Sequence, residues 1–365
     1  MIRYRKEVDR IAPYVPGKLI DAVKKEYGIT DVVKLASNEN PLGMGSAAAD
    51  AIKAHMDHVH LYPDGSCAVL REKLAWNLGV ASDWIIVGNG SDEILKMIAE
   101  VYLTEADAVI IAESTFSQYR FAADLMGAET RFVPLIDYRH DLEGMARQID
   151  SKTKIVFICN PNNPTGTIVS HAELEQFLNQ VPEHVLVVVD EAYYEYVTSQ
   201  LYPQAVKLME YYPNMMITRT FSKVYGLAGL RIGYGIANPE IIKALERVKE
   251  PFNVNQFAQA AACASLDDQE HLRKSIEVNE QGKEYLYQQF ELLKLKAIPT
   301  ETNFILVDLQ RDGKQVSQQL LTKGVIVRPT DSFALPNCIR VTIGTMEQNR
   351  RFIQALGEVL YADRY

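Results

Sequence analysis

Cysteine is sparse in this sequence, and its few copies are not paired. Cys67, Cys159, Cys263 and Cys338 lie far apart in a chain of 365 residues, and no C-x-x-C pair occurs. Disulfide frameworks and zinc sites normally require paired, regularly spaced cysteines. The pattern therefore favours reduced thiols in a cytosolic protein, and we expect no metal site.

Long hydrophobic runs are also missing. No apolar stretch approaches the roughly 18 residues that a membrane-spanning helix needs. The N-terminal stretch MIRYRKEVDRIAPY has no apolar core of the kind found in signal peptides. We therefore expect a soluble, cytoplasmic protein with no membrane partner.

Positive charge is in the minority. Lysine and arginine total 38 against 47 for aspartate and glutamate, which gives a formal net charge of −9. Without a basic patch or run, a nucleic-acid partner is not expected, although a locally basic pocket could still bind an anionic small molecule. The hydrophobic share of 47% is ordinary for a globular protein, and the length suggests two domains.

Short apolar runs alternate with helical patterns through the middle of the chain. Runs that are apolar throughout are typical of strands covered on both faces, so the sequence predicts an α/β domain with a mainly parallel sheet. The strands are expected within residues 84–88, 108–113, 154–160, 184–193, 215–222 and 231–237.

The alternation of short apolar runs and helical patterns ends near residue 251. A long polar helical stretch follows, and then come three further candidate strands within residues 303–309, 324–329 and 338–344. We predict a large domain over residues 36–250 and a smaller α+β domain over residues 251–365. The segment 1–35 is expected to pack with the small domain.

Polar residues follow four of the strands predicted in the large domain. They are GNGSDE (88–93), NPNNPTG (160–166), DEAYYEY (190–196) and a segment that contains Lys223. Ligands of α/β sheets gather at the carboxyl ends of the strands. The four segments would supply a turn that can bind phosphate, an amide, a carboxylate with a phenol, and an amine. Each segment alone is weak evidence for a ligand site, but their combination in this order is much less expected by chance.

In this combination the sequence resembles the fold-type I aminotransferases that use pyridoxal 5'-phosphate, and among them the histidinol-phosphate aminotransferase family. The resemblance covers nearly the whole chain. Besides the strand-end segments, it is carried by KLASNENPLG (34–43), LYPDG (61–65), RTFSKVYGLAGLRIGY (219–234), EPFNVNQFAQAAA (250–262), VRP (327–329) and IRVTIGT (339–345).

The resemblance implies a role for each residue around the cofactor ring. Lys223 would bond covalently to the cofactor and then move a proton, which requires the neutral amine. Asp190 would pair with the protonated pyridine nitrogen and so keep the ring in its electron-accepting state. Tyr193 and Asn163 would bind the phenolic oxygen of the ring, and Phe116 would cover its face.

The same resemblance implies a phosphate site and a homodimer. In the family, a tyrosine from the neighbouring subunit reaches the cofactor phosphate, and Tyr62 matches that position, so that two subunits would share their active sites. An arginine is suited to this phosphate because its planar fork matches the phosphate oxygens. The phosphate ligands from the same chain would be Gly90, Ser91, Thr220, Ser222 and Arg231.

For the substrate, the resemblance implies two arginines and a tyrosine. Arg340 matches the residue that binds the carboxylate of an amino acid, or the phosphate of histidinol phosphate in its place. Arg328 and Tyr14 match further anion contacts. The segment between the arginines departs from the family pattern, with Ala334 where relatives often have glycine.

The implied reaction is a ping-pong transamination in histidine biosynthesis. Glutamate would donate its amino group, 2-oxoglutarate would leave, and imidazole acetol phosphate would become L-histidinol phosphate. An aromatic amino acid aminotransferase and a phosphothreonine decarboxylase of the same fold stay open as alternatives. A cofactor-binding regulator is disfavoured because no DNA-binding domain is evident, and an oxidoreductase because the glycine fingerprint of dinucleotide binding is incomplete.

Overall fold

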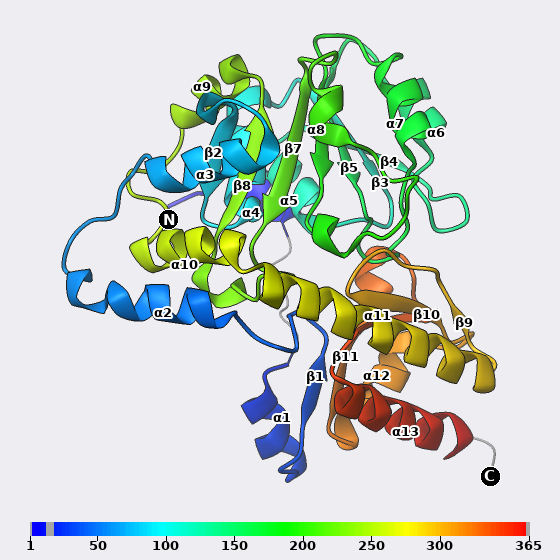
Figure 1. The fold of residues 1–365 in the computed structure, drawn as a ribbon. Helices are drawn as coiled ribbons and strands as arrows, with labels where there is room; N and C mark the ends of the chain where they lie inside the picture. The colour runs from blue at the N-terminus through cyan, green and yellow to red at the C-terminus, as the bar shows by residue number, and fades with distance from the viewer. Residues whose placement is uncertain (1, 12–17, 363–365) are drawn as a thin grey trace.

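Two β-sheets organise residues 2–11 and 18–362, which the computed structural model describes (Figure 1). The larger sheet has seven strands in the order β2-β8-β7-β6-β5-β3-β4, and the smaller has five in the order β1-β11-β12-β10-β9. The strands are β1 (Val33–Leu35), β2 (Ile85–Gly88), β3 (Ala108–Ala112), β4 (Glu129–Val133), β5 (Thr153–Cys159), β6 (Leu186–Asp190), β7 (Met215–Thr220), β8 (Gly233–Ala237), β9 (Lys296–Ala297), β10 (Phe304–Asp308), β11 (Val325–Pro329) and β12 (Cys338–Thr342).

Helices cover both sheets. The α-helices of the described residues are α1 (Ile20–Tyr27), α2 (Ser46–Ala54), α3 (Ala68–Leu78), α4 (Ser91–Tyr102), α5 (Ser117–Met126), α6 (Leu142–Arg147), α7 (His171–Leu178), α8 (Ala205–Leu208), α9 (Pro239–Glu246), α10 (Gln256–Asp267), α11 (Gln269–Leu292), α12 (Gly313–Thr322) and α13 (Met346–Ala362).

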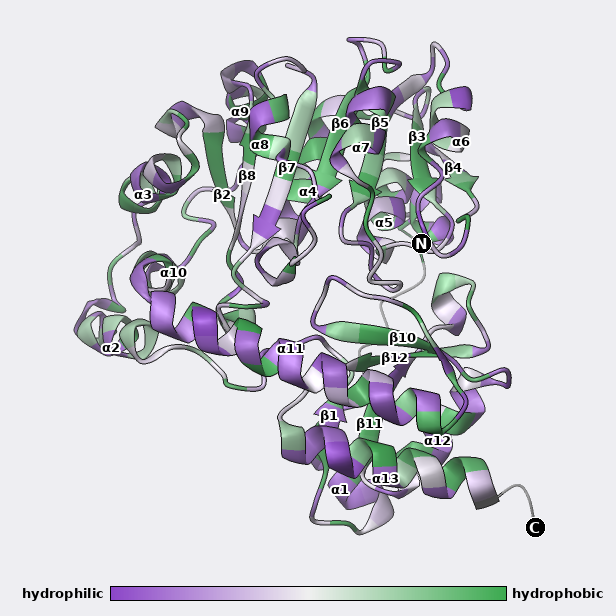
Figure 2. Ribbon diagram, turned by 45° about the vertical axis from the view of Figure 1, so that its right-hand side comes forward, coloured by the Kyte–Doolittle hydropathy of each residue, from purple (hydrophilic) through white to green (hydrophobic). Residues whose placement is uncertain are grey.

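The larger sheet is mainly parallel, as predicted. Only β8 runs against its neighbours, β7 and β2. Apart from the partly exposed edge strand β4, its strands are almost fully buried, because helices pack on both faces of the sheet. Val187 and Val189 of β6 lie in one core cluster, and Val188 lies in the other. Burial of each such side chain contributes about 1.5–3 kcal/mol. Figure 2 shows these strands mostly in the hydrophobic colour.

The smaller sheet combines distant parts of the chain. Strand β1 pairs in parallel with β11, and β12, β10 and β9 follow in that order, each antiparallel to the strand before it. Helix α11 runs beside this sheet. Helix α10 instead contributes Ala258, Ala261, Ala262 and Leu266 to a core cluster of the larger sheet. The domain boundaries at residues 36 and 251 stay a prediction.

The fold brings three strand ends of the larger sheet to one edge. Strands β5, β6 and β7 are parallel neighbours, so the segments after Cys159, at Asp190 and after Thr220 lie side by side. The smaller sheet lies below this edge in Figure 1. Residues from both sheets can therefore face one cleft.

Within residues 2–11 and 18–362, no helix combines the length and the apolar character that crossing a membrane requires. Over the same residues, no group of three or more His, Cys, Asp or Glu side chains is placed to hold a metal ion.

A glycine in the Lys223 segment makes a close backbone contact that tests this packing. Gly226 has φ +70°, and a Cβ there would lie 2.1 Å from the carbonyl oxygen of Gly43. Gly226→Ala is expected to lower the free energy of unfolding by at least about 1–3 kcal/mol, the range for a strained backbone. Urea denaturation measures the loss. The matched control is Gly229→Ala, where a Cβ meets nothing within 4 Å, and the account is wrong if both variants unfold alike.

Candidate active site

A cavity of about 800 Å³ lies at the carboxyl edge of the larger sheet and is also lined by the smaller sheet. The larger sheet and its loops contribute Asp190, Tyr193 and Lys223, and the smaller sheet contributes Arg328 and Arg340. The other predicted site residues that line it are Ser91, Phe116, Asn163, Thr220, Ser222 and Arg231. The structure therefore brings most of the predicted set together in one place.

Asp190 ends β6 as a buried carboxylate, only 2% exposed. Its Oδ2 accepts a hydrogen bond of 2.7 Å from the hydroxyl of Tyr119. Its Oδ1 is buried without a hydrogen-bond partner among the described residues. Burial raises the pKa of Asp190 to about 6, while the Tyr119 hydrogen bond lowers it. One carboxylate oxygen thus remains for a cationic or N–H partner in the cavity.

Lys223 follows β7 by three residues and shares the cavity with Asp190. Burial first, and then the positive charge of Arg340, lower the pKa of its amine to about 8. Its Nζ lies 5.6 Å from the ring centroid of Tyr193. A larger fraction of this amine is therefore neutral near pH 7 than of an ordinary lysine, as a nucleophile requires.

A buried hydrogen-bond network holds the side chains around Tyr193. Asn38 Nδ2 donates 2.9 Å to the Tyr193 hydroxyl, and Arg340 Nη1 donates to Asn163 Oδ1. Arg340 Nη2 also donates 2.8 Å to the Ala36 carbonyl. These hydrogen bonds connect segments that precede the larger sheet, follow its strands and belong to the smaller sheet, and so they fix the positions of these side chains. The sequence did not assign Asn38 any role, although it belongs to the SNENP motif.

A second group forms around the start of α4. Gly90 precedes this helix with φ +82°, and a Cβ there would lie 2.6 Å from Arg231 Nη2. Arg231 Nη1 lies 3.5 Å from Ser222 Oγ, and Arg231 Nη2 lies 3.3 Å from Asp92 Oδ2. Backbone N–H groups at a helix start, a guanidinium and hydroxyls are the donors that a phosphate needs.

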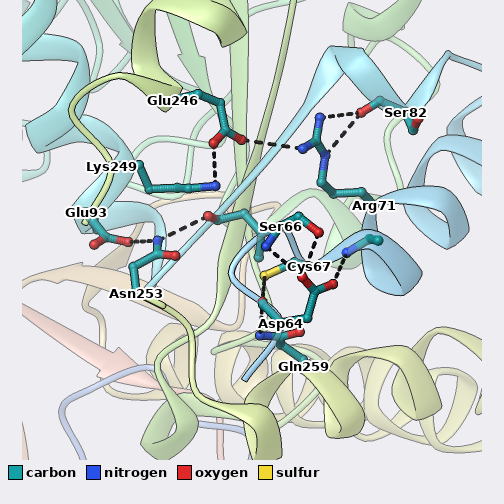
Figure 3. A network of polar contacts seen from close by, with 12 residues as sticks. Asp64, Ser66, Cys67, Arg71, Ser82, Glu93, Glu246, Lys249, Asn253 and Gln259 are labelled. Carbon is teal, nitrogen blue, oxygen red and sulfur yellow. Dashed lines mark hydrogen bonds and ion pairs between the residues drawn. The ribbon is translucent and has the colours of Figure 1, made fainter. Parts of the chain in front are cut away.

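Glu93 fastens the turn before this helix (Figure 3). Its Oε2 accepts a 2.6 Å hydrogen bond from Asn253 Nδ2, which the figure shows. The same oxygen accepts 2.6 Å from the backbone N–H of Asn89. The same view shows Asp64 at the start of α3, where Asp64 accepts from the backbone N–H groups of Ser66 and Ala68. In both turns a carboxylate accepts the backbone N–H groups of the turn.

The two arginines of the smaller sheet are cross-strand partners. Arg328 of β11 and Arg340 of β12 are paired in register, which places their side chains on the same face of the sheet. Two guanidinium groups can thus meet an anionic substrate. Nearby, Ala334 has φ +60°, a conformation that favours glycine. The loop adopts this left-handed turn although alanine stands at the position.

Among the described residues that the sequence predicted, Gly90 and Tyr62 do not line this cavity. The Tyr62 ring is 82% exposed and stacks on Phe252 with a centroid distance of 4.7 Å. Tyr14 lies outside the described residues. The cavity also has lining residues that the sequence did not indicate, among them Arg10 and Arg120. Neither lies in a motif at a strand end, so no sequence signal marked them.

Known proteins match the chain over nearly its whole length. The family described as aminotransferase class I and II matches residues 30–356. A histidinol-phosphate aminotransferase of Moorella thermoacetica is 56% identical and covers 98% of this chain and 92% of its own length. One from a Geobacillus species is 51% identical over 96% of both.

This chain belongs to the histidinol-phosphate aminotransferase family. The solved structure of histidinol-phosphate aminotransferase from Sinorhizobium meliloti in complex with pyridoxal-5'-phosphate superposes with a TM-score of 0.93, at 26% identity, over 99% of this chain and 98% of that one. The predictions of a fold-type I transferase fold, of an aminotransferase and of pyridoxal 5'-phosphate as cofactor are confirmed.

The amine of Lys223 gives this family member a pH dependence that can be measured. In the cofactor-free protein, acylation of Lys223 by an amine-reactive ester is expected to reach half its maximal rate near pH 8, because only the neutral amine reacts. The rate falls below that pH as the amine gains a proton. Peptide mapping by mass spectrometry follows the site. A midpoint above pH 10 would show an ordinary, solvated lysine.

Proposed function

We propose that this chain transfers an amino group from glutamate to imidazole acetol phosphate, giving L-histidinol phosphate and 2-oxoglutarate, and that it acts in histidine biosynthesis. The observation that carries the proposal is the placement of the Lys223 amine, the unpaired Asp190 oxygen and the Arg328–Arg340 pair around one cavity. The amine could react with an aldehyde, the carboxylate oxygen could accept a hydrogen bond from a pyridinium nitrogen, and the two arginines could bind an anionic substrate.

The residues present fit pyridoxal 5'-phosphate. The buried Asp190 Oδ1 lacks a partner among the described residues, as expected of the group that would accept a hydrogen bond from the pyridine nitrogen. We propose that Gly90, Ser91, Thr220, Ser222 and Arg231 hold the phosphate, and that Phe116 covers the ring. When bound, the cofactor supplies an aldehyde that takes up the amino group and a charged ring that accepts electron density.

Lys223 would first hold the cofactor covalently through Nζ and later act as the general base. Its Nζ removes the proton from the α-carbon of the bound amino substrate, a step that needs a neutral amine near the operating pH. Asp190 keeps its negative charge beside the pyridine nitrogen. Tyr193 and Asn163 would donate hydrogen bonds to the phenolic oxygen and so orient the ring.

The arginines would bind the two anionic substrates in turn. Arg340 is nine-tenths buried and already oriented by Asn163 and Ala36, so little conformational entropy is lost when it meets a carboxylate or a phosphate. Arg328 lies beside it on the next strand and adds a second guanidinium. Tyr14 remains a proposed contact from the segment before α1.

The active enzyme is proposed to be a homodimer in the cytoplasm. An exposed aromatic such as Tyr62, held by stacking on Phe252, has the character of a residue that acts in another subunit. We propose that its hydroxyl reaches the phosphate in the partner's cavity. The unpaired cysteines support the cytoplasmic location.

A spectral titration of the half-reaction tests the substrate. L-histidinol phosphate, L-tyrosine and L-phosphothreonine are each added to the cofactor-loaded protein, and loss of the near-ultraviolet or visible band is followed. We expect kcat/KM for histidinol phosphate to exceed that of tyrosine by at least about tenfold, because both arginines bind its phosphate. Lys223→Ala, the control, should lose the band and the turnover. A tenfold preference for tyrosine would refute the assignment.

Subunit complementation tests the shared site. Tyr62→Phe is expected to weaken pyridoxal phosphate binding by about tenfold, since one hydrogen bond to a charged group is lost. Mixing this variant with Lys223→Ala chains should restore tight binding, because the mixed dimer pairs an intact Lys223 with an intact Tyr62. Sedimentation should give twice the mass of one chain. A monomer, or mixing without recovery, would exclude the shared site.

A further inference from the structure

Tyr119 is a buried side chain behind the carboxylate of Asp190. It lies in the first turns of α5, is 0% exposed, and its ring stacks on Phe157 with a centroid distance of 4.8 Å and an interplanar angle of 8°. Its hydroxyl donates 2.7 Å to Asp190 Oδ2. Packing therefore fixes the ring, and the ring fixes where the hydroxyl points.

The hydrogen bond makes the two oxygens of Asp190 unequal. Oδ2 is taken by Tyr119, whereas Oδ1 is buried with no hydrogen-bond partner among the described residues. The backbone of Asp190 is itself held in the sheet, where its carbonyl accepts 2.9 Å from the N–H of Asn160. The Tyr119 hydrogen bond therefore limits rotation of the carboxylate, and Oδ1 is the oxygen left for a ligand. The Thr218 side chain and the Ala192 backbone also lower the pKa of this carboxylate.

The phenol can act only as a donor here. Burial raises the pKa of Tyr119 well above its ordinary value, and the nearby charge of Asp190 raises it further, so the hydroxyl keeps its proton. Burial also raises the pKa of Asp190, and the Tyr119 hydrogen bond opposes that rise. The bond thus favours the ionised carboxylate that a protonated ring nitrogen requires.

We propose that Tyr119 is a positioning residue for the cofactor ring: its hydroxyl orients Asp190 so that Oδ1 meets the pyridine nitrogen. The inference rests on the proposed function, since it concerns the same site. Tyr119 touches neither substrate nor ring atom in this scheme. It acts through Asp190, and its effect should therefore depend on the ring nitrogen.

Comparing the binding of two ligands distinguishes this positioning role from a merely structural role of Tyr119. Pyridoxal 5'-phosphate has the ring nitrogen, and 1-deazapyridoxal 5'-phosphate carries a C–H group in its place. We expect Tyr119→Phe to weaken binding of the first to the cofactor-free protein by about tenfold, as one hydrogen bond to a charged group is lost, and to leave binding of the second nearly unchanged. Equilibrium dialysis measures both dissociation constants.

The matched control is Tyr287→Phe. Tyr287 is also a hydrogen-bonded tyrosine away from the cavity, with its hydroxyl donating 3.0 Å to the Ile298 carbonyl and accepting 2.9 Å from the N–H of Thr300. It should lower thermal stability without changing the ratio of the two dissociation constants. Far-ultraviolet circular dichroism confirms that each variant is folded before binding is measured.

The outcomes separate the inference from the proposed function. Equal weakening of both ligands by Tyr119→Phe, or no weakening of either, overturns the positioning role. If the unaltered protein prefers pyridoxal phosphate over its deaza analogue and Tyr119→Phe keeps that preference in full, the inference fails alone. If the unaltered protein binds neither ligand, the proposed function fails with it.

Discussion

The site depends on a buried carboxylate and a half-buried amine that lie at the ends of adjacent parallel strands. Asp190 ends β6, and Lys223 follows β7, its neighbour in the sheet. Burial shifts the pKa of each toward its neutral form, upward for Asp190 and downward for Lys223. Such groups are costly without partners, and the burial of apolar side chains on both faces of the sheet offsets that cost. A ligand with a charged ring nitrogen and an aldehyde relieves both costs.

The smaller sheet contributes an arginine, Arg340, to the cavity at the edge of the larger sheet. Arg340 lies on β12, yet it donates to Asn163 after β5 and to the carbonyl of Ala36 after β1. Three segments far apart in the sequence therefore meet at one guanidinium. The same charge contributes to the lowered pKa of Lys223, so the substrate binding proposed for Arg340 would be electrostatically linked to the reactivity of the Lys223 amine.

Much of this site was predictable because its residues follow apolar strands in the sequence. Asp190 and Lys223 stand at such ends, and the mainly parallel sheet follows from strands with no polar alternation. Tyr119 was not predictable: on α5 it reads as a core aromatic, and only the fold shows that its hydroxyl meets Asp190. Asn38 and the three-residue strand β1 depend likewise on partners about 155 or more positions away.

The central claim is that Asp190 keeps the cofactor's pyridine nitrogen protonated. The most direct measurement is nitrogen-15 NMR of the bound cofactor, labelled at the ring nitrogen, at neutral pH. The account predicts the chemical shift of a protonated nitrogen in the unaltered protein and that of an unprotonated nitrogen in Asp190→Asn, each with the cofactor bound. An unprotonated nitrogen in the unaltered protein would contradict it.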